Sequence, residues 1–121
     1  MPNMTSQLEC FRISEWHSVL RPNEDERVNI SGGMECEVKL HEDPLVNRMM
    51  LECTFDLHGE DREVFSIHGV AEAYFSLSER DDDNMDEVIM EQCIPVVQRE
   101  VEHHIAVITE SLGFPPVKLG N

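Results

Sequence analysis

Two adjacent histidines, His103 and His104, are the residues of this sequence most suggestive of metal chemistry. Two histidines on one helix can share a zinc ion when they are four positions apart. Adjacent helical residues instead point about 100° apart, so this pair cannot chelate one ion in that way. His104 falls on the apolar stripe of a predicted helix, and His103 faces more polar ground. We interpret them as one histidine at the edge of the core and one at the surface, and we predict no metal site.

The four cysteines are widely spaced and form no Cys-x-x-Cys pair: Cys10, Cys36, Cys53 and Cys93. Cys36 and Cys53 share the buried positions of two predicted strands and could lie opposite one another, where packing accounts for them without zinc or catalysis. The N-terminal residues show neither the basic nor the apolar segment of a secretion signal. We therefore expect reduced thiols in a cytoplasmic protein.

The sequence contains no recognisable catalytic motif. It lacks a glycine-rich phosphate loop, a Gly-x-Ser-x-Gly turn and a His-Glu-x-x-His helix. Carboxylate pairs are frequent, but in so acidic a chain they occur by chance. A small acidic enzyme would need titratable groups that converge in a pocket, and none is indicated. We predict that the protein is not an enzyme and needs no cofactor.

The net charge of the chain limits the classes of molecule that we expect it to bind. Nine Lys and Arg residues stand against 25 Asp and Glu residues, for a net charge of −16. Such a chain repels nucleic-acid phosphates and anionic membranes, and it favours solubility and basic partners. No run of 18 apolar residues is present. We therefore expect neither nucleic acid nor membrane as a partner.

Three segments alternate between apolar and polar residues with the period of a strand that has one buried face. The apolar positions are even within Val28–Leu40 and odd within Met49–Leu57 and Phe65–Leu77. Short turns join these segments and imply antiparallel neighbours. Gly32 and Gly33 suggest a bulge or a bend in the first of the three.

An earlier and less regular strand is predicted over Leu8–Leu20, because Phe11 and Ile13 leave the register set by Leu8 and Cys10. The polar segment Arg21–Glu26 then forms a loop. These features add a fourth strand, ahead of the three regular ones.

After Leu77 the period becomes helical. The acidic loop Ser78–Asp83 can supply an Asp or Asn cap to a short helix around Met85 and Ile89. A long helix follows over Ile94–Ser111, opened by a proline. The order of four strands and then two helices predicts a single α+β domain over residues 1–121, with the helices on one face of an antiparallel sheet.

Two surfaces are candidate binding sites. Methionine is flexible and recurs on surfaces that accept varied apolar partners, although packing in the core explains any single methionine equally well. The predicted binding groove for apolar partners consists of Trp16, Met34, Met85, Ile89 and Met90. The polar faces of the strands supply a predicted partner-docking acidic face, which consists of Glu35, Glu37, Glu52, Asp56 and Glu72.

The chain resembles the SecB family of export chaperones, from about Leu8 to Leu119 and most clearly after Phe65. Phe75-Ser76-Leu77 matches a strand end that reads Phe-Ser-Ile in that family, and Met85 and Cys93 fall where the family carries Met and Cys. The segment Leu112–Leu119 resembles the closing Gly-x-Phe-Pro-x-Leu-x-Leu of that family.

The resemblance implies a four-stranded antiparallel sheet, a short crossover helix and a long helix. It implies a homo-oligomer, either a dimer or a tetramer formed as a dimer of dimers. It also implies ATP-independent holding of unfolded or secretory proteins, with the acidic sheet surface docked on the translocase ATPase SecA.

Two family motifs are replaced in this chain. Gln98–His103 stands where the family has Phe-Pro-Tyr-x-Arg-Glu, and Ser66–His68 stands where it has the SecA-docking Leu-x-Glu. Fold is therefore expected to transfer more directly than function. We predict a protein-export type of holdase; the alternative is a SecB-fold adaptor that binds one partner, such as an antitoxin, through its acidic face.

Overall fold

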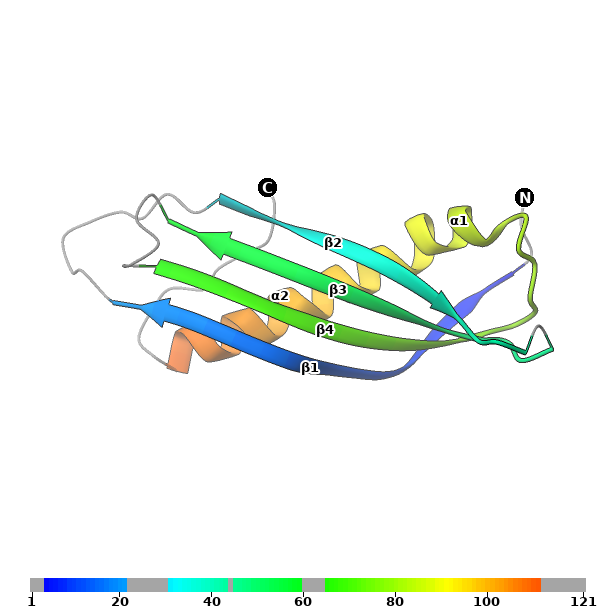
Figure 1. Ribbon diagram of the computed structural model, residues 1–121, viewed down its shortest axis with the longest axis horizontal. Coiled ribbons are helices and arrows are strands. Elements are labelled where there is room, and N and C mark those ends of the chain that lie inside the picture. Colours follow the sequence, from blue (N-terminus) through cyan, green and yellow to red (C-terminus); the bar gives the residue numbers. More distant parts are fainter. Residues whose placement is uncertain (1–3, 22–30, 44, 60–64, 112–121) are drawn as a thin grey trace.

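The computed structural model describes residues 4–21, 31–43, 45–59 and 65–111. Four strands precede one helical segment that lies along one face of their sheet (Figure 1). The strands are β1 (Ser6–Leu20), β2 (Ser31–Leu40), β3 (Arg48–His58) and β4 (Phe65–Leu77). The helical segment consists of α1 (Met85–Val88), a π-helical turn η1 (Ile89–Cys93) and α2 (Ile94–Ser111). The predicted α+β fold is confirmed.

The strands form one fully antiparallel sheet in the order β1-β4-β3-β2. β2, β3 and β4 are consecutive neighbours, as their short connections predict. β1 pairs with β4, so the first two strands lie at opposite edges of the sheet. In Figure 1, α2 crosses behind the sheet, which leaves the nearer face of the sheet without a helix.

The alternation in the sequence divides the sheet into a buried and a solvent-facing side. On the central strands β3 and β4, every second residue is buried and its neighbours are partly or fully exposed. The buried residues join those of α2 in one core, where Val97, Val101 and Ile105 are completely inaccessible. Burying side chains of this size stabilises the fold by roughly 1.5–3 kcal/mol each.

Two irregularities in β1 explain its uneven pattern. Its pairing with β4 shifts between Leu8 and Cys10 and again between Ile13 and Glu15. Each extra residue reverses the side on which the following residues lie. Phe11 therefore comes opposite the buried Ala73. The departure from register noted in the sequence is confirmed as a β-bulge.

Gly32 and Gly33, where we expected a bulge or a bend, form no bulge. β2 pairs with β3 without a register shift from Ser31 opposite His58 to Leu40 opposite Met49. Gly32 is instead a point of close approach, since a Cβ atom there would lie 2.9 Å from the Cα of Leu57.

The proline expected to open the long helix lies within a continuous helical segment. The backbone N–H of Ile94 donates to the carbonyl of Ile89, five residues back, and the next residue, Pro95, has no N–H to donate. The helix thus forms a π-turn just before Pro95, the residue that cannot donate the backbone hydrogen bond of a regular α-helix. The predicted short helix and long helix consequently join without a loop.

The helix start is also capped differently from our expectation. Asn84 occupies the N-cap position, but its side chain makes no capping bond to the helix backbone. Its Nδ2 donates to Oδ2 of Asp81 at 2.6 Å. The loop before α1 is therefore held by side chains within the loop.

Gln92, in the π-turn, connects the helical segment to the start of the sheet. Its Oε1 accepts hydrogen bonds from the backbone N–H of Ser6 at 2.9 Å and from the Ser6 hydroxyl at 3.2 Å. Its Nε2 donates to the carbonyl of Met4 at 3.1 Å. The π-turn thus presents a side chain that positions the first residues of β1.

Several sequence-based expectations lie outside the described residues. They are the strand positions Val28 and Ile30, most of the loop Arg21–Glu26 and the helix-terminating segment Leu112–Leu119.

Candidate functional site

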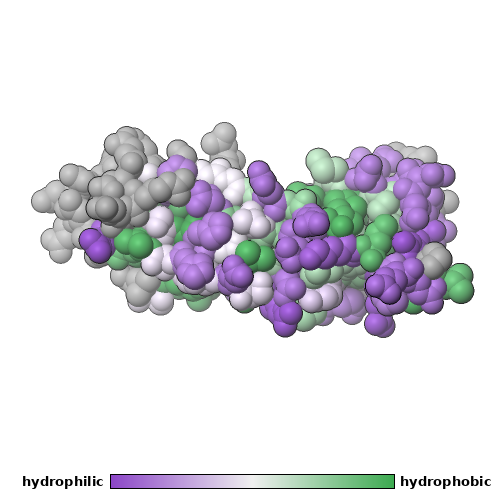
Figure 2. All heavy atoms as spheres, in the orientation of Figure 1, coloured by the Kyte–Doolittle hydropathy of each residue, from purple (hydrophilic) through white to green (hydrophobic). Residues whose placement is uncertain are grey.

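The five carboxylates of the predicted acidic face lie on the side of the sheet away from α2. Glu37, Glu52 and Glu72 are directly opposite one another on β2, β3 and β4 and form one row across the sheet. Glu35 precedes this row by two residues on β2, and Asp56 follows it on β3. Figure 2 shows this side of the molecule, where hydrophilic side chains surround smaller hydrophobic areas.

Two basic side chains form ion pairs with carboxylates of this row. Nε of Arg12 lies 2.6 Å from Oε1 of Glu72, and Nζ of Lys39 lies 3.2 Å from Oε2 of Glu52. These bonds raise the pKa of Arg12 and the pKa of Lys39, so both side chains remain charged at neutral pH. The strongest unpaired negative charge of the row is therefore at Glu37, for which the described residues supply no ion-pair partner.

Asp56 belongs to a cluster with two histidines. Its carboxylate lies 3.3 Å from Nδ1 of His58 and 3.7 Å from Nδ1 of His68. Within the described ranges, no group of three His, Cys, Asp or Glu side chains has the geometry to hold a metal ion. Of the two adjacent histidines, His104 donates a hydrogen bond from Nδ1 to the carbonyl of Glu100 at 2.8 Å, and its ring centroid lies 5.1 Å from that of Phe11.

A groove of about 600 Å³ opens at the β2–β3 turn end of the sheet. Met50 and Tyr74 lie opposite one another on the polar face there, with Lys39 and Arg48 beside them. Sequence reasoning did not select these residues. The available signal was Met50, an apolar residue at a position where the alternation of β3 predicts a polar one.

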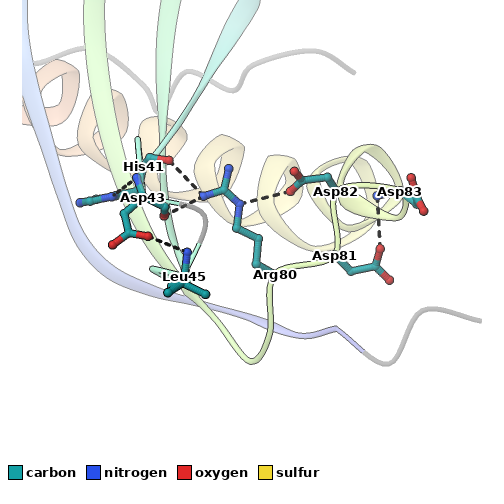
Figure 3. A network of polar contacts seen from close by, with 7 residues as sticks. All are labelled: His41, Asp43, Leu45, Arg80, Asp81, Asp82 and Asp83. Carbon is teal, nitrogen blue, oxygen red and sulfur yellow. Dashed lines mark hydrogen bonds and ion pairs between the residues drawn. The ribbon is translucent and has the colours of Figure 1, made fainter.

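Arg80 holds the turn that borders this groove (Figure 3). Its NH1 group donates to the carbonyls of His41 at 3.0 Å and Asp43 at 3.1 Å, and its Nε lies 3.2 Å from Oδ1 of Asp82. Only 12% of the Arg80 side chain is exposed. The acidic loop before α1 thus contains one largely enclosed basic side chain, that of Arg80, which links the loop to the β2–β3 turn.

The predicted groove residues fall into three places. Trp16 and Met34 lie on the helix side of β1 and β2, at the two edges of the sheet. They share one row, with Phe55 and Gly69 between them. Trp16 contacts the ring of Phe55 at a centroid distance of 6.0 Å, and both Trp16 and Met34 are half-buried. Since three strand spacings separate them, they are about 14 Å apart and do not contact each other.

The helical members of the predicted groove differ in accessibility. Met85 and Ile89 are only 4% and 6% exposed and belong to the core, whereas Met90 is 68% exposed. A groove that is open in this conformation therefore includes Met90 but neither Met85 nor Ile89.

Apolar residues continue on the helix side beyond the area that α2 covers. We call Met34, Cys36, Val38 and Leu40 the β2 margin, and Phe11, Ile13, Trp16 and Leu20 the β1 margin. Val38 and Leu40 are 38% and 39% exposed, and the other six are half-buried. The alternation predicted that these residues share one face, but not that they remain accessible at the edges of that face.

No helix of the described chain is both long and apolar enough to cross a membrane.

Comparison with known proteins gives a clear result only at the level of structure. No protein-family model matches the sequence, and no curated protein matches it. A Mycobacterium tuberculosis SecB-like chaperone, solved in complex with a ChAD peptide from the HigA1 antitoxin, superposes with a TM-score of 0.76 and 13% sequence identity. That alignment covers 97% of this chain and 90% of the chaperone.

A second structure is less similar. A protein of unknown function from Streptococcus agalactiae aligns with a TM-score of 0.54 and 18% identity, over 99% of this chain and all of that one. Both identities are too low to carry function. The fold is SecB-like, and its match to the Mycobacterium tuberculosis chaperone extends over almost the whole chain.

Proposed function

We propose that this SecB-like chain is an ATP-independent holdase that binds unfolded protein segments along the helix side of its sheet. The observation that carries the proposal is the pair of apolar margins on the edge strands, which α2 leaves partly exposed. Solvent-accessible apolar residues grouped on one face mark surfaces that bind other proteins. The structural likeness to a chaperone supports the same conclusion.

The β2 margin is suited to an extended client. An edge strand presents unpaired backbone N–H and C=O groups, to which another chain can add as a further strand. Val38 and Leu40 lie two residues apart on the same face of β2. They would therefore contact alternate side chains of a client strand paired with β2. Backbone bonds would supply affinity for any sequence, and the apolar row would favour clients rich in apolar residues.

The acidity of the chain fits a holding function. With a net charge of −16, loaded complexes repel one another and remain soluble. The acidic row on the opposite face is proposed as a docking surface for a basic partner. SecA is the candidate that the resemblance implies, although Ser66–His68 stands at the position of the docking motif.

An adaptor for one dedicated partner is the second candidate function. The observation in its favour is that the Mycobacterium tuberculosis chaperone is bound to a peptide of an antitoxin. Capture of one stoichiometric protein from the native lysate would favour the adaptor, whereas capture of many unfolded proteins would favour the holdase.

Aggregation of a chemically denatured test protein, diluted without ATP, tests the holdase. We expect suppression between substoichiometric and equimolar amounts of this chain. Absence of suppression at every ratio would refute the proposal.

A pair of variants tests the location of the binding surface. Val38→Ser, on the β2 margin, should weaken suppression. Val107→Ser makes the same chemical change at a valine that is 52% exposed on α2 and should leave suppression unchanged. Equal effects of the two changes would exclude the β2 margin as the binding surface.

A further inference from the structure

Cys36 and Cys53 lie directly opposite each other on β2 and β3. Both occupy the helix-side positions of their strands, so their side chains project from the same face. Residues directly opposite in an antiparallel pair have Cα atoms about 4.5–5.5 Å apart. A disulfide requires a Cα separation of about 4.4–6.8 Å. The Cα separation of directly opposite residues thus falls within the range of a disulfide, while both cysteines are free in this structure.

The two thiols differ in solvation. Cys53 is completely inaccessible, whereas Cys36 is half-buried at the edge of the sheet. Since an anion is better solvated at Cys36, the neighbouring Cys53 thiol acts as a donor toward it and lowers the pKa of Cys36, whereas the neighbouring Cys36 and burial raise the pKa of Cys53. Cys36 is thus the accessible nucleophile and Cys53 the enclosed thiol beside it.

The other two cysteines have no such arrangement. Cys10 is exposed on β1 opposite Tyr74, and Cys93 is buried in η1. Neither is opposite another cysteine in the sheet. Intramolecular oxidation should therefore be confined to one pair of thiols.

We propose that Cys36 and Cys53 are a redox-modification site, at which a peroxide oxidises the pair to a cross-strand disulfide. The thiolate of Cys36 attacks one oxygen of hydrogen peroxide, the O–O bond breaks, and with one proton the products are a Cys36 sulfenic acid and water. The sulfur of Cys53 then attacks the sulfur of the sulfenic acid. Its thiol proton leaves with the departing hydroxide as a second water. Two thiols and one peroxide thus yield one disulfide and two waters.

The disulfide would join an edge strand covalently to a central strand. Cys36 is the second of the four residues of the β2 margin, between Met34 and Val38. Oxidation would therefore fix the strand that carries this surface. The cysteine chemistry itself does not depend on the proposed holdase function.

Peroxide treatment of the whole protein, followed by denaturation, alkylation and peptide mapping, tests the proposal. The wild type should lose two of its four alkylatable thiols, as a linked Cys36–Cys53 peptide that dithiothreitol separates. Cys10→Ser should oxidise at the wild-type rate. A map in which Cys36 and Cys53 both remain alkylatable, or in which cross-links involve only Cys10, would overturn the proposal.

Cys53→Ser provides a second measurement that does not depend on recovering the linked peptide. In this variant the sulfenic acid at Cys36 has no adjacent thiol, so trapping by dimedone should rise at least several-fold over the wild type. Equal trapping in the two proteins would show that Cys53 does not resolve the oxidised Cys36, and would equally overturn the proposal.

Discussion

At the scale of single residues, Gly69 determines how β1 packs against the sheet. It lies between Phe55 on β3 and Trp16 on β1 in one row across the helix-side face. Because Gly69 has no side chain, the ring of Phe55 occupies the space above it and meets Trp16. A glycine within a strand is thus required here by close packing.

Gly69→Ala should therefore destabilise the protein. The added Cβ would clash with the ring of Phe55 and lie 2.7 Å from the carbonyl oxygen of Glu15. Overpacking of this kind costs about 1–3 kcal/mol. Urea denaturation measures the change, and Gly33→Ala is the matched control, because no atom lies within 4 Å of a Cβ there. Equal midpoints for the two variants would contradict this packing.

Cys53→Ala should change the titration of Cys36. The neighbouring Cys53 thiol, as a donor, lowers the pKa of Cys36, so Cys36 becomes reactive at a lower pH than an ordinary thiol. Loss of the donor should shift the pH profile of its alkylation rate upward. The rate is measured with iodoacetamide in a Cys10→Ser, Cys93→Ser background, and an unchanged or downward-shifted profile would disprove the donor role of Cys53.

The sequence predicted well which side of each strand faces the core. It predicted less well which apolar residues remain accessible to solvent. The apolar character of Met85 and Ile89 suggested a groove, but helical geometry places both in the core and leaves Met90 exposed. Val38 and Leu40 resembled core residues, yet they lie on an edge strand that α2 does not fully cover. Exposure depends on which strands form the edges, and alternation along one strand does not contain that information.

At the scale of elements, the π-turn η1 performs two tasks. It accommodates the missing N–H of Pro95, and it places Gln92 against the first residues of β1. Sequence patterns with a helical period cannot reveal a local change to a π-turn, so the sequence suggested two helices. The strands were better predicted, since the alternation of β3 and β4 and the bulged register of β1 are visible in single segments.

Gln92→Ala should loosen the start of β1. It removes three hydrogen bonds and leaves the part-buried N–H of Ser6 without its acceptor. We expect a loss of about 1–3 kcal/mol in unfolding free energy and faster hydrogen exchange at Ser6. The control is Gln7→Ala, since Gln7 is exposed. Unchanged exchange at Ser6 would show that Gln92 does not hold this end of the strand.

At the scale of the whole molecule, the sheet separates two kinds of surface. One face carries the acidic row, and the other carries the core with an apolar margin on each side. Covering the β1 margin in a second copy would remove exposed apolar area from water, as in other oligomers, and would leave the β2 margin open to clients.

Light scattering should therefore give a mass of two or four times the 13.9 kDa of the single chain. A monomeric wild type at high micromolar concentration would contradict the proposed homo-oligomer.

The most direct test of the account is to locate a bound client. A photo-cross-linking amino acid is placed at position 38 on the β2 margin or, as control, at position 107 on α2, both partly exposed valines. The protein is then irradiated with a reduced, alkylated client that cannot refold. We predict cross-linking from position 38 well above that from position 107. Equal cross-linking from the two positions, or none from position 38, would contradict binding of unfolded chains along the β2 margin.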